Sequence, residues 1–487
     1  MTSSNYQSNS VDLDSTYIVG NDPNYQGIQA AVTNRKTVVF GQQLINQAYP
    51  VGNLNGAINY TQSLPGTMVD QDSTRITGVG PTAVFYNNRA NAQSLIRGSF
   101  GISLENYPQN LSWQINGTNQ LAPAQQPAYS TWTSIVMGGQ YSTDSSYWSV
   151  AIQSNGTLWA WGINSWGGIG LNTTTNYNYP VQVGALNNWA QIACGMSDTL
   201  AIQSNGTLWA WGNNSYGQLG TINQTHYSSP VQVGALSTWK KISSGWSHSA
   251  AIQTNGTLWT WGYNGYGALG TGNITNYSSP VQVGALSVWT QITCGNYYTA
   301  ALQSNGTLWA WGLNQQGQLG LGNQTNYSSP IQVGNLSTWT QVVAGSSSTM
   351  SIQSNGTLWA CGYNFYGNLG LNTSTSKYSS PVQVGTLSTW SQISCGYSFV
   401  IALQTPGTLW TWGNNQYGRL GLNTLTNGYS SPVQVGALSV WTKISCGYIT
   451  AAAIQTPGTL YTWGNNSFGQ LGLTPLGISV TKITYGL

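Results

Sequence analysis

The residue types that carry acid–base or metal chemistry are scarce in most of this chain. Between residues 131 and 487 the only carboxylate side chains are Asp144 and Asp198, and the only histidines are His226 and His248. General acid–base catalysis needs titratable groups within hydrogen-bond reach of each other, and a protein metal centre usually takes three or more ligands. We therefore expect no enzyme activity, no metal site and no cofactor. Asp198 and His248 occupy the same position in adjacent repeats and are the one pair that could act together.

The elements that position these residues come from one repeated unit. The sequence Gly-Thr-Leu followed by Trp or Tyr recurs at intervals of 50 or 51 residues. The seven copies begin at Gly156, Gly206, Gly256, Gly306, Gly356, Gly407 and Gly458. A near-identical unit of about 50 residues fits one four-stranded propeller blade better than a solenoid repeat.

Each unit can be divided into four strands. In residues 246–295, an apolar run over 249–253 and an alternating run over 257–262 flank Asn255-Gly256, which is typical of a tight hairpin turn. A glycine-rich loop follows, and residues 277–284 contain a proline that favours an edge strand. Residues 289–295 supply a strand that leads into the next hairpin. We predict an all-β fold, a seven-bladed β-propeller of four-stranded blades.

The unit resembles the regulator of chromosome condensation repeat. The resemblance rests on residues 209–212 (WAWG), 214–220 (NSYGQLG), 230–233 (PVQV) and 242–245 (ISSG), and it covers about residues 131–487. It implies a seven-bladed propeller. One member of this family is a guanine-nucleotide exchange factor that also binds chromatin, and another is a secreted bacterial inhibitor of β-lactamase.

The chain divides into a propeller and a different N-terminal part. We predict an extended arm over residues 1–30, a small β-rich anchoring domain over 31–118, a linker over 119–130 and the propeller over 131–487. The I-x-x-G strand occurs once more than the hairpin, at both 135–138 and 483–486. We therefore predict that residues 480–487 pair with 149–153, so that both chain ends share one blade.

Composition excludes some partners. Only 4% of the 487 residues are charged and the net charge is +3, whereas about a quarter of residues are charged in typical domains. The few bases do not form the dense basic stripe that phosphate binding requires, so we expect no nucleic-acid partner. Residues 1–30 are polar and acidic, and no long apolar run occurs, so we expect neither a signal peptide nor membrane insertion.

Candidate binding residues come from positions that vary between otherwise copied units. The three positions after the I-x-x-G glycine change in type while their neighbours do not. Such loops gather at one end of a propeller, and aromatic side chains there suit recognition of a sugar or a protein. The predicted binding residues are Met196, Asp198, Trp246, His248, Tyr297, Tyr298, Tyr397, Phe399 and Tyr448. A second aromatic set, which follows the hairpin and includes Tyr216, Tyr266 and Tyr366, is predicted to pack between blades.

The leading functional hypothesis is a non-enzymatic virion surface protein, such as a capsid decoration or a tail-fibre head. Residues 1–130 would dock to other virion proteins, with homo-oligomerisation as one way of doing so, and the propeller would bind a host glycan or protein. The first alternative is a protein-binding module or enzyme inhibitor that uses its aromatic loops, placed outside the cell or in the cytosol. The second is a guanine-nucleotide exchange factor, which the absence of an acidic cluster disfavours.

Overall fold

The computed structural model describes residues 131–140, 146–374 and 377–473, together with the backbone of strands β1–β8 and β36. The chain forms two compact units, one of residues 1–117 and 474–484 and one of residues 118–473 and 485–487. No helix in the described part of the chain is long and apolar enough to span a membrane.

The first unit contains a six-stranded sheet in which β5 pairs with β3, β4 and β6. Its strands are β1 (Thr16–Val19), β2 (Thr37–Phe40), β3 (Gly56–Tyr60), β4 (Gly66–Asp70), β5 (Arg75–Asn87) and β6 (Leu95–Ser103). A separate pair joins β7 (Leu111–Ser112) to β36 (Ile483–Thr484). Most of the expected arm and anchoring domain lies outside the described residues, so their roles stay predictions.

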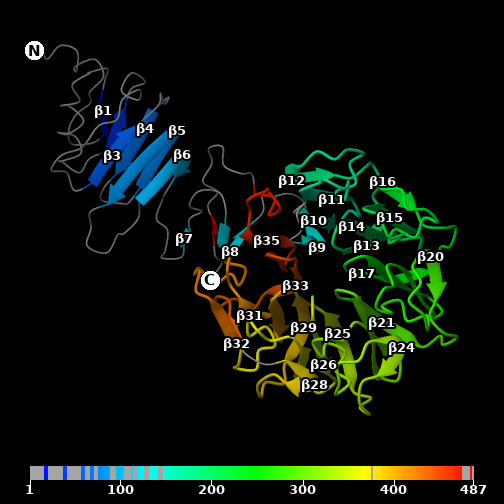
Figure 1. The fold of residues 1–487 in the computed structure, drawn as a ribbon. Coiled ribbons are helices and arrows are strands. Elements are labelled where there is room, and N and C mark those ends of the chain that lie inside the picture. The colour runs from blue at the N-terminus through cyan, green and yellow to red at the C-terminus, as the bar shows by residue number, and fades with distance from the viewer. Residues whose placement is uncertain are drawn as a thin grey trace, which may run out of the picture. The chain divides into compact units, whose positions relative to one another are not determined.

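The second unit consists of seven four-stranded antiparallel sheets, which confirms the seven-bladed propeller. Figure 1 shows the sheets following one another around a ring, from β9 in cyan to β35 in red. The strands of blades 1 to 3 are β9 (Trp132–Gln140), β10 (Ser146–Gln153), β11 (Leu158–Gly162), β12 (Tyr177–Gln182); β13 (Trp189–Cys194), β14 (Asp198–Gln203), β15 (Leu208–Gly212), β16 (Tyr227–Gln232); and β17 (Trp239–Ser244), β18 (His248–Gln253), β19 (Leu258–Gly262), β20 (Tyr277–Gln282). Those of blades 4 and 5 are β21 (Trp289–Cys294), β22 (Tyr298–Gln303), β23 (Leu308–Gly312), β24 (Tyr327–Gln332); and β25 (Trp339–Ala344), β26 (Ser348–Gln353), β27 (Leu358–Gly362), β28 (Tyr378–Gln383). Those of blades 6 and 7 are β29 (Trp390–Cys395), β30 (Phe399–Gln404), β31 (Thr408–Asn414), β32 (Gly428–Gln434); and β33 (Trp441–Cys446), β34 (Thr450–Gln455), β35 (Thr459–Asn465), β8 (Asn119–Gln125).

Local chemistry explains why each unit forms a blade. The hairpin between the second and third strands turns at an Asn-Gly pair in blades 1 to 5, and the glycine takes the left-handed conformation there, with φ of 81° at Gly256. The Asn255 side chain accepts a hydrogen bond from the Thr257 amide at 3.1 Å, which fixes the turn. The proline of the fourth strand, such as Pro280, lies on the outermost strand of its sheet, where no ladder hydrogen bond is lost.

Tryptophans join each blade to its neighbour. The indole of Trp261 in β19 donates to the Gln218 carbonyl of the preceding blade at 2.8 Å, and Trp311 donates to Ala268 at 2.9 Å. Gly270 has to be glycine because an added Cβ would lie 2.7 Å from the Trp311 indole nitrogen. The apolar core accordingly lies between blades, and its clusters combine residues of adjacent blades.

The ring closes differently from our prediction. The Ser149 region does not pair with the C-terminal segment, because β10 lies between β9 and β11. Residues 119–125, which we expected in a linker, form β8 and pair with β35 as the outermost strand of blade 7. Both the Trp161 indole and the Ser149 hydroxyl in blade 1 donate to the Gln470 carbonyl in blade 7, at 3.0 and 2.8 Å.

Candidate binding surface

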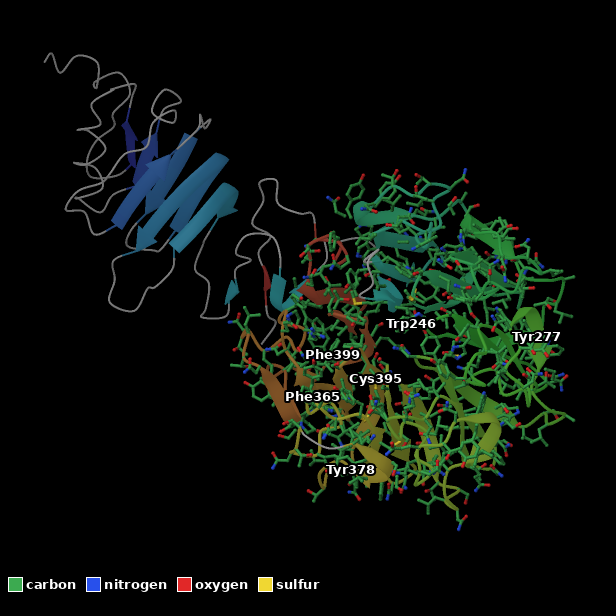
Figure 2. All side chains as sticks on the ribbon, in the orientation of Figure 1. Trp246, Tyr277, Phe365, Tyr378, Cys395 and Phe399 are labelled. Carbon is green, nitrogen blue, oxygen red and sulfur yellow. The ribbon has the colours of Figure 1, made fainter. Side chains whose placement is uncertain are left out.

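One end of the ring gathers the variable loops. In each blade it is formed by the turn between the first and second strands and the loop between the third and fourth, residues 245–247 and 263–276 in blade 3. These two segments lie side by side, since the Tyr263 amide donates to the Ser247 carbonyl at 2.8 Å. We call this side of the propeller the aromatic end. In Figure 2, Trp246 of this turn lies nearer the middle of the ring, while Tyr277 and Tyr378 on outermost strands lie near its edge.

A central cavity of about 160 Å³ opens among the first strands and their turns. All seven blades contribute to its lining, with glycines such as Gly195 and Gly295 forming much of its wall. Five residues of the predicted set touch it or its rim: Met196, Trp246, Tyr397 and Tyr448 line it, and Tyr297 packs against Trp246. The aromatic side chains are thus arranged around a shared central depression.

Four predicted binding residues do not reach the surface. The side chains of Asp198, His248, Tyr298 and Phe399 are buried, so their placement on an exposed loop face is wrong. Each begins the second strand of its blade, and three of them bond to a hydroxyl or carbonyl of the next blade. Tyr298, for example, donates its hydroxyl to the Ser348 carbonyl at 2.6 Å. These positions vary because each must fit one particular neighbour.

Asp198 and His248 have separate partners. The Ser244 hydroxyl donates to Asp198 at 2.6 Å, and His248 Nε2 lies 3.0 Å from the Thr299 hydroxyl. Burial raises the pKa of Asp198 to about 7, although the Ser244 hydrogen bond acts against this rise. Burial lowers the pKa of His248 to about 4. Both side chains therefore pack between blades, and neither is placed to act on a bound substrate.

The richest aromatic cluster lies over blades 2 to 4. Tyr297 stacks on Trp246 with ring centroids 5.1 Å apart and also packs on Tyr263 and Tyr266, each at 5.3 Å. Tyr216 joins the cluster through Tyr263, at 5.0 Å. Partial burial and the neighbouring phenols, Tyr263 first, raise the pKa of Tyr297 to about 12, so its hydroxyl is a donor at neutral pH.

Tyr297 has an unusual backbone for a bulky residue. Its φ is 60°, in the left-handed region that large side chains rarely adopt. The equivalent positions in blades 2, 3, 5, 6 and 7 are Ser197, Ser247, Ser347, Ser398 and Ile449, and none has a positive φ. Such strain is retained where surrounding contacts enforce it, and it is common at binding sites.

A second cluster lies over blades 6, 7 and 1. Tyr397 stacks on Tyr448 at 4.2 Å, and Tyr147 lies 6.3 Å from both Tyr448 and Phe468. Burial, followed by the neighbouring Tyr397, holds the pKa of Tyr448 far above its usual range. Arg419 lies beside this cluster: its Nη1 donates to the Tyr448 carbonyl at 3.4 Å, and its guanidinium lies 5.5 Å from the Tyr417 ring centroid.

Several surface aromatics were missed as binding candidates. Tyr216, Tyr266, Tyr366 and Phe468 belong to the set predicted to pack between blades. Tyr216 and Phe468 do contact a ring of the next blade, as predicted, but all four side chains are also 37–45% exposed. Phe365, at 60% exposed, was not considered. The sequence did contain an indication. Position 365 is Phe, whereas the equivalent position is Ser215 in blade 2 and Gly265 in blade 3, although the rest of the loop is nearly identical.

These features define a seven-bladed β-propeller that presents aromatic rings around a central depression. Within the described ranges, no group of three or more His, Cys, Asp or Glu residues is arranged to hold a metal ion. Residues 235–484 match the family model of the RCC1-like domain, and residues 155–202 and 205–252 match the regulator of chromosome condensation (RCC1) repeat. The chain belongs to the RCC1-like domain family.

Curated relatives share a short segment. Human probable E3 ubiquitin-protein ligase HERC4 is 34% identical over 84 residues, which is 17% of this chain and 8% of that protein. Human probable E3 ubiquitin-protein ligase HERC3 is 35% identical over 85 residues, again 17% of this chain and 8% of the relative. The matched segment is thus less than a tenth of either relative, and their ligase activity is a property of those proteins.

Solved structures share the fold. Human WBSCR16 superposes with a TM-score of 0.61 at 21% identity, covering 71% of this chain and 89% of that one. Prp20p from Saccharomyces cerevisiae, studied with Gsp1p and histones, gives a TM-score of 0.58 at 19% identity, covering 69% of this chain and 82% of that one. At these identities the likeness establishes the architecture of the propeller.

Proposed function

We propose that this chain is a non-enzymatic protein-binding module whose aromatic end holds a partner protein. The observation that carries this proposal is the set of partly exposed Trp, Tyr and Phe side chains at the aromatic end, of which Trp246, Tyr397 and Tyr448 line the central cavity. Tyr and Trp are enriched at protein interfaces because they bring large apolar area together with a polar group. Prp20p offers a precedent, since its structure was described together with binding to Gsp1p and histones.

We further propose a setting for this module on a virion surface. The low charge of the chain, the near-identical repeats and the separate unit formed by residues 1–117 support this view. In this setting the first unit attaches to another virion protein and the propeller contacts the host. Size-exclusion chromatography with light scattering on the full chain tests the assembly part: we expect a trimer or higher oligomer, and a well-behaved monomer would remove its main support.

Site-specific photocrosslinking on the full chain tests the binding function. A photoreactive phenylalanine analogue placed at Phe365 or Tyr266 should crosslink to one protein in material from the natural source. The matched control is the same analogue at Leu286, which is 51% exposed at the opposite end of the ring. Crosslinks at both ends, or at neither, would count against a dedicated aromatic interface. Binding to a glycan array with no protein crosslink would favour the host-glycan alternative.

Guanine-nucleotide exchange is the second candidate, favoured only by the match to the RCC1-like domain model. Stimulated release of labelled nucleotide from a small GTPase would support it. No stimulation at micromolar concentrations would leave the binding function without exchange activity.

A further inference from the structure

Arg419 departs from the pattern of its repeat. At this position of the third-to-fourth-strand loop, blades 2, 4 and 7 carry Gln218, Gln318 and Gln470. In blade 2 the Gln218 amide donates to Asn213 at 2.9 Å, and its carbonyl accepts from the Tyr216 backbone at 2.9 Å. Arginine has no acceptor and cannot make the second bond. Arg419 instead reaches the next blade.

Arg419 is a buried cation with few partners. Its side chain is 3% exposed, and its Nε is enclosed without a hydrogen-bond partner. Nη1 donates to the Tyr448 carbonyl at a long 3.4 Å. Asp198 is the sole acidic residue within 131–140, 146–374 and 377–473, and it accepts a hydrogen bond from Ser244. A buried charge is costly when its donors are unpaired, so this arrangement is incomplete.

Aromatic rings surround the guanidinium without satisfying it. The Phe399 and Tyr417 ring centroids lie 5.7 and 5.5 Å from Arg419 Cζ. Such cation–π contacts offset part of the cost of burial, but they supply no hydrogen-bond acceptor for Nε. Burial lowers the pKa of Arg419 to about 10, while the nearby tyrosines act in the opposite direction, so the group is charged at neutral pH.

Arg419 lies directly beneath residues of the aromatic end that a partner would contact. Tyr448 lines the central cavity and Tyr417 is half-buried in a loop of the aromatic end. A carboxylate can accept two parallel hydrogen bonds from the fork of an arginine, and this pairing is among the strongest hydrogen-bonded contacts in proteins. An acidic side chain of the partner would therefore complete the hydrogen bonding of Arg419.

We propose that Arg419 anchors a carboxylate-binding site at the aromatic end, and that it takes a Glu or Asp side chain of the partner protein. The site itself stands on the buried, under-bonded guanidinium, whereas the source of the carboxylate rests on the proposed binding function. Arg419→Gln is a matched variant, because three sister blades fold with glutamine here. Arg419→Lys keeps the positive charge but loses the planar guanidinium that can donate two parallel hydrogen bonds.

Thermal unfolding of the full chain in sodium acetate, with sodium chloride at equal ionic strength as reference, tests the site. If acetate binds only the folded protein, an acetate concentration of ten times the Kd should raise the folded-to-unfolded ratio about 11-fold. We expect this acetate-dependent rise in Tm for the wild type, a smaller one for Arg419→Lys and none for Arg419→Gln. An equal response in wild type and Arg419→Gln, or none in wild type at 200 mM acetate, would overturn the site.

Crosslinking from Phe365 separates the site from the function. We expect Arg419→Gln to reduce partner crosslinking at least tenfold. If the acetate response depends on Arg419 but crosslinking is unchanged, the carboxylate does not come from the partner and that assignment is wrong. If no partner is captured by either protein while the acetate response persists, the carboxylate site stands and the proposed protein-binding function fails.

Discussion

The residue that begins the second strand of each blade shows how variation between repeats can mislead. Asp198, His248, Tyr298 and Phe399 differ in size and charge, which on a surface would indicate ligand contacts. They are buried because each packs on the following blade, as Asp198 does on Ser244. A side chain and its partner can change together without altering either blade. The sequence alone does not distinguish such paired packing from exposure, whereas the preceding turn residues, such as Trp246, do reach the cavity.

Asp198 makes stability depend on pH. Its pKa rises from its usual value to about 7 on burial, so the folded protein holds a proton that the unfolded chain has lost. The resulting stabilisation is present below about pH 4 and is lost as the pH rises to about 7. We expect Asp198→Asn to match the wild type near pH 4 and to exceed its free energy of unfolding by roughly 2–4 kcal/mol at pH 8.

Urea unfolding of both proteins at several pH values measures this difference. His248 has a pKa lowered to about 4, so its contribution is present above about pH 6.5 and is lost as the pH falls toward 4. This opposite trend partly masks that of Asp198 in the wild type. It cancels in the difference between the two proteins, because both contain His248. A difference that does not change between pH 4 and pH 8 would show that Asp198 is ionised in the folded state.

At the scale of the element, the sequence predicts the blade well. The hairpin at Asn255-Gly256, the edge strand at Pro280 and the strand beginning at Trp289 all form as expected, because turn chemistry and alternation act locally. The link between blades was harder to foresee. It depends on one tryptophan indole reaching a carbonyl about 43 residues earlier, as Trp261 reaches Gln218, which no local pattern encodes.

Blade 5 departs from this linkage. Six blades place a fully buried tryptophan at the second aromatic position of the third strand, whereas blade 5 has Cys361. The Cys361 thiol lies 3.7 Å from the Gln318 carbonyl, where an indole would otherwise donate. A cavity of about 410 Å³ lies beside it, lined by Gly320, Trp339 and Trp359 among others.

We expect Cys361→Trp to stabilise the propeller. The indole can donate to the Gln318 carbonyl and pack on Trp339, as Trp311 packs on Trp289 at 6.1 Å in blade 4. Cavity filling of this kind commonly adds about 0.5–2 kcal/mol to the free energy of unfolding. Differential scanning calorimetry should show a higher Tm.

The reciprocal variant Trp311→Cys is the control. It opens the same space in blade 4 and should cost about 3–5 kcal/mol, as other losses of large aromatics do. If Cys361→Trp instead lowers the Tm, the space beside Gly320 does not accept an indole and the blade has adapted to the smaller side chain.

At the scale of the whole molecule, the repeat count predicts seven blades but not how the ring closes. The surplus I-x-x-G segment at 483–486 suggested closure by the C-terminus. Closure instead uses β8, in which Ala124 and Gln125 pair with Thr462 and Tyr461, as Val231 and Gln232 pair with Ala210 and Trp209 in blade 2. The preceding Pro123 therefore matches Pro230 in register. The Pro-x-Gln pattern of the fourth strand is thus present at residues 123–125. It is short, and the proline- and glutamine-rich residues around it are typical of a linker, so it did not lead to the prediction of a strand.

The closing strand should decide where the chain can be shortened. A protein that begins at residue 118 keeps β8, whereas one that begins at residue 131 leaves β35 as an unpaired sheet edge. Exposed edges promote association between molecules, and blade 7 also supplies the Gln470 carbonyl that binds Trp161 and Ser149. We expect the 118–487 protein to be monomeric and to unfold cooperatively. The 131–487 protein should have a lower Tm and form aggregates, measured by light scattering during heating. Equal melting of the two proteins would mean that six complete blades and the contacts at Gln470 hold the ring without β8.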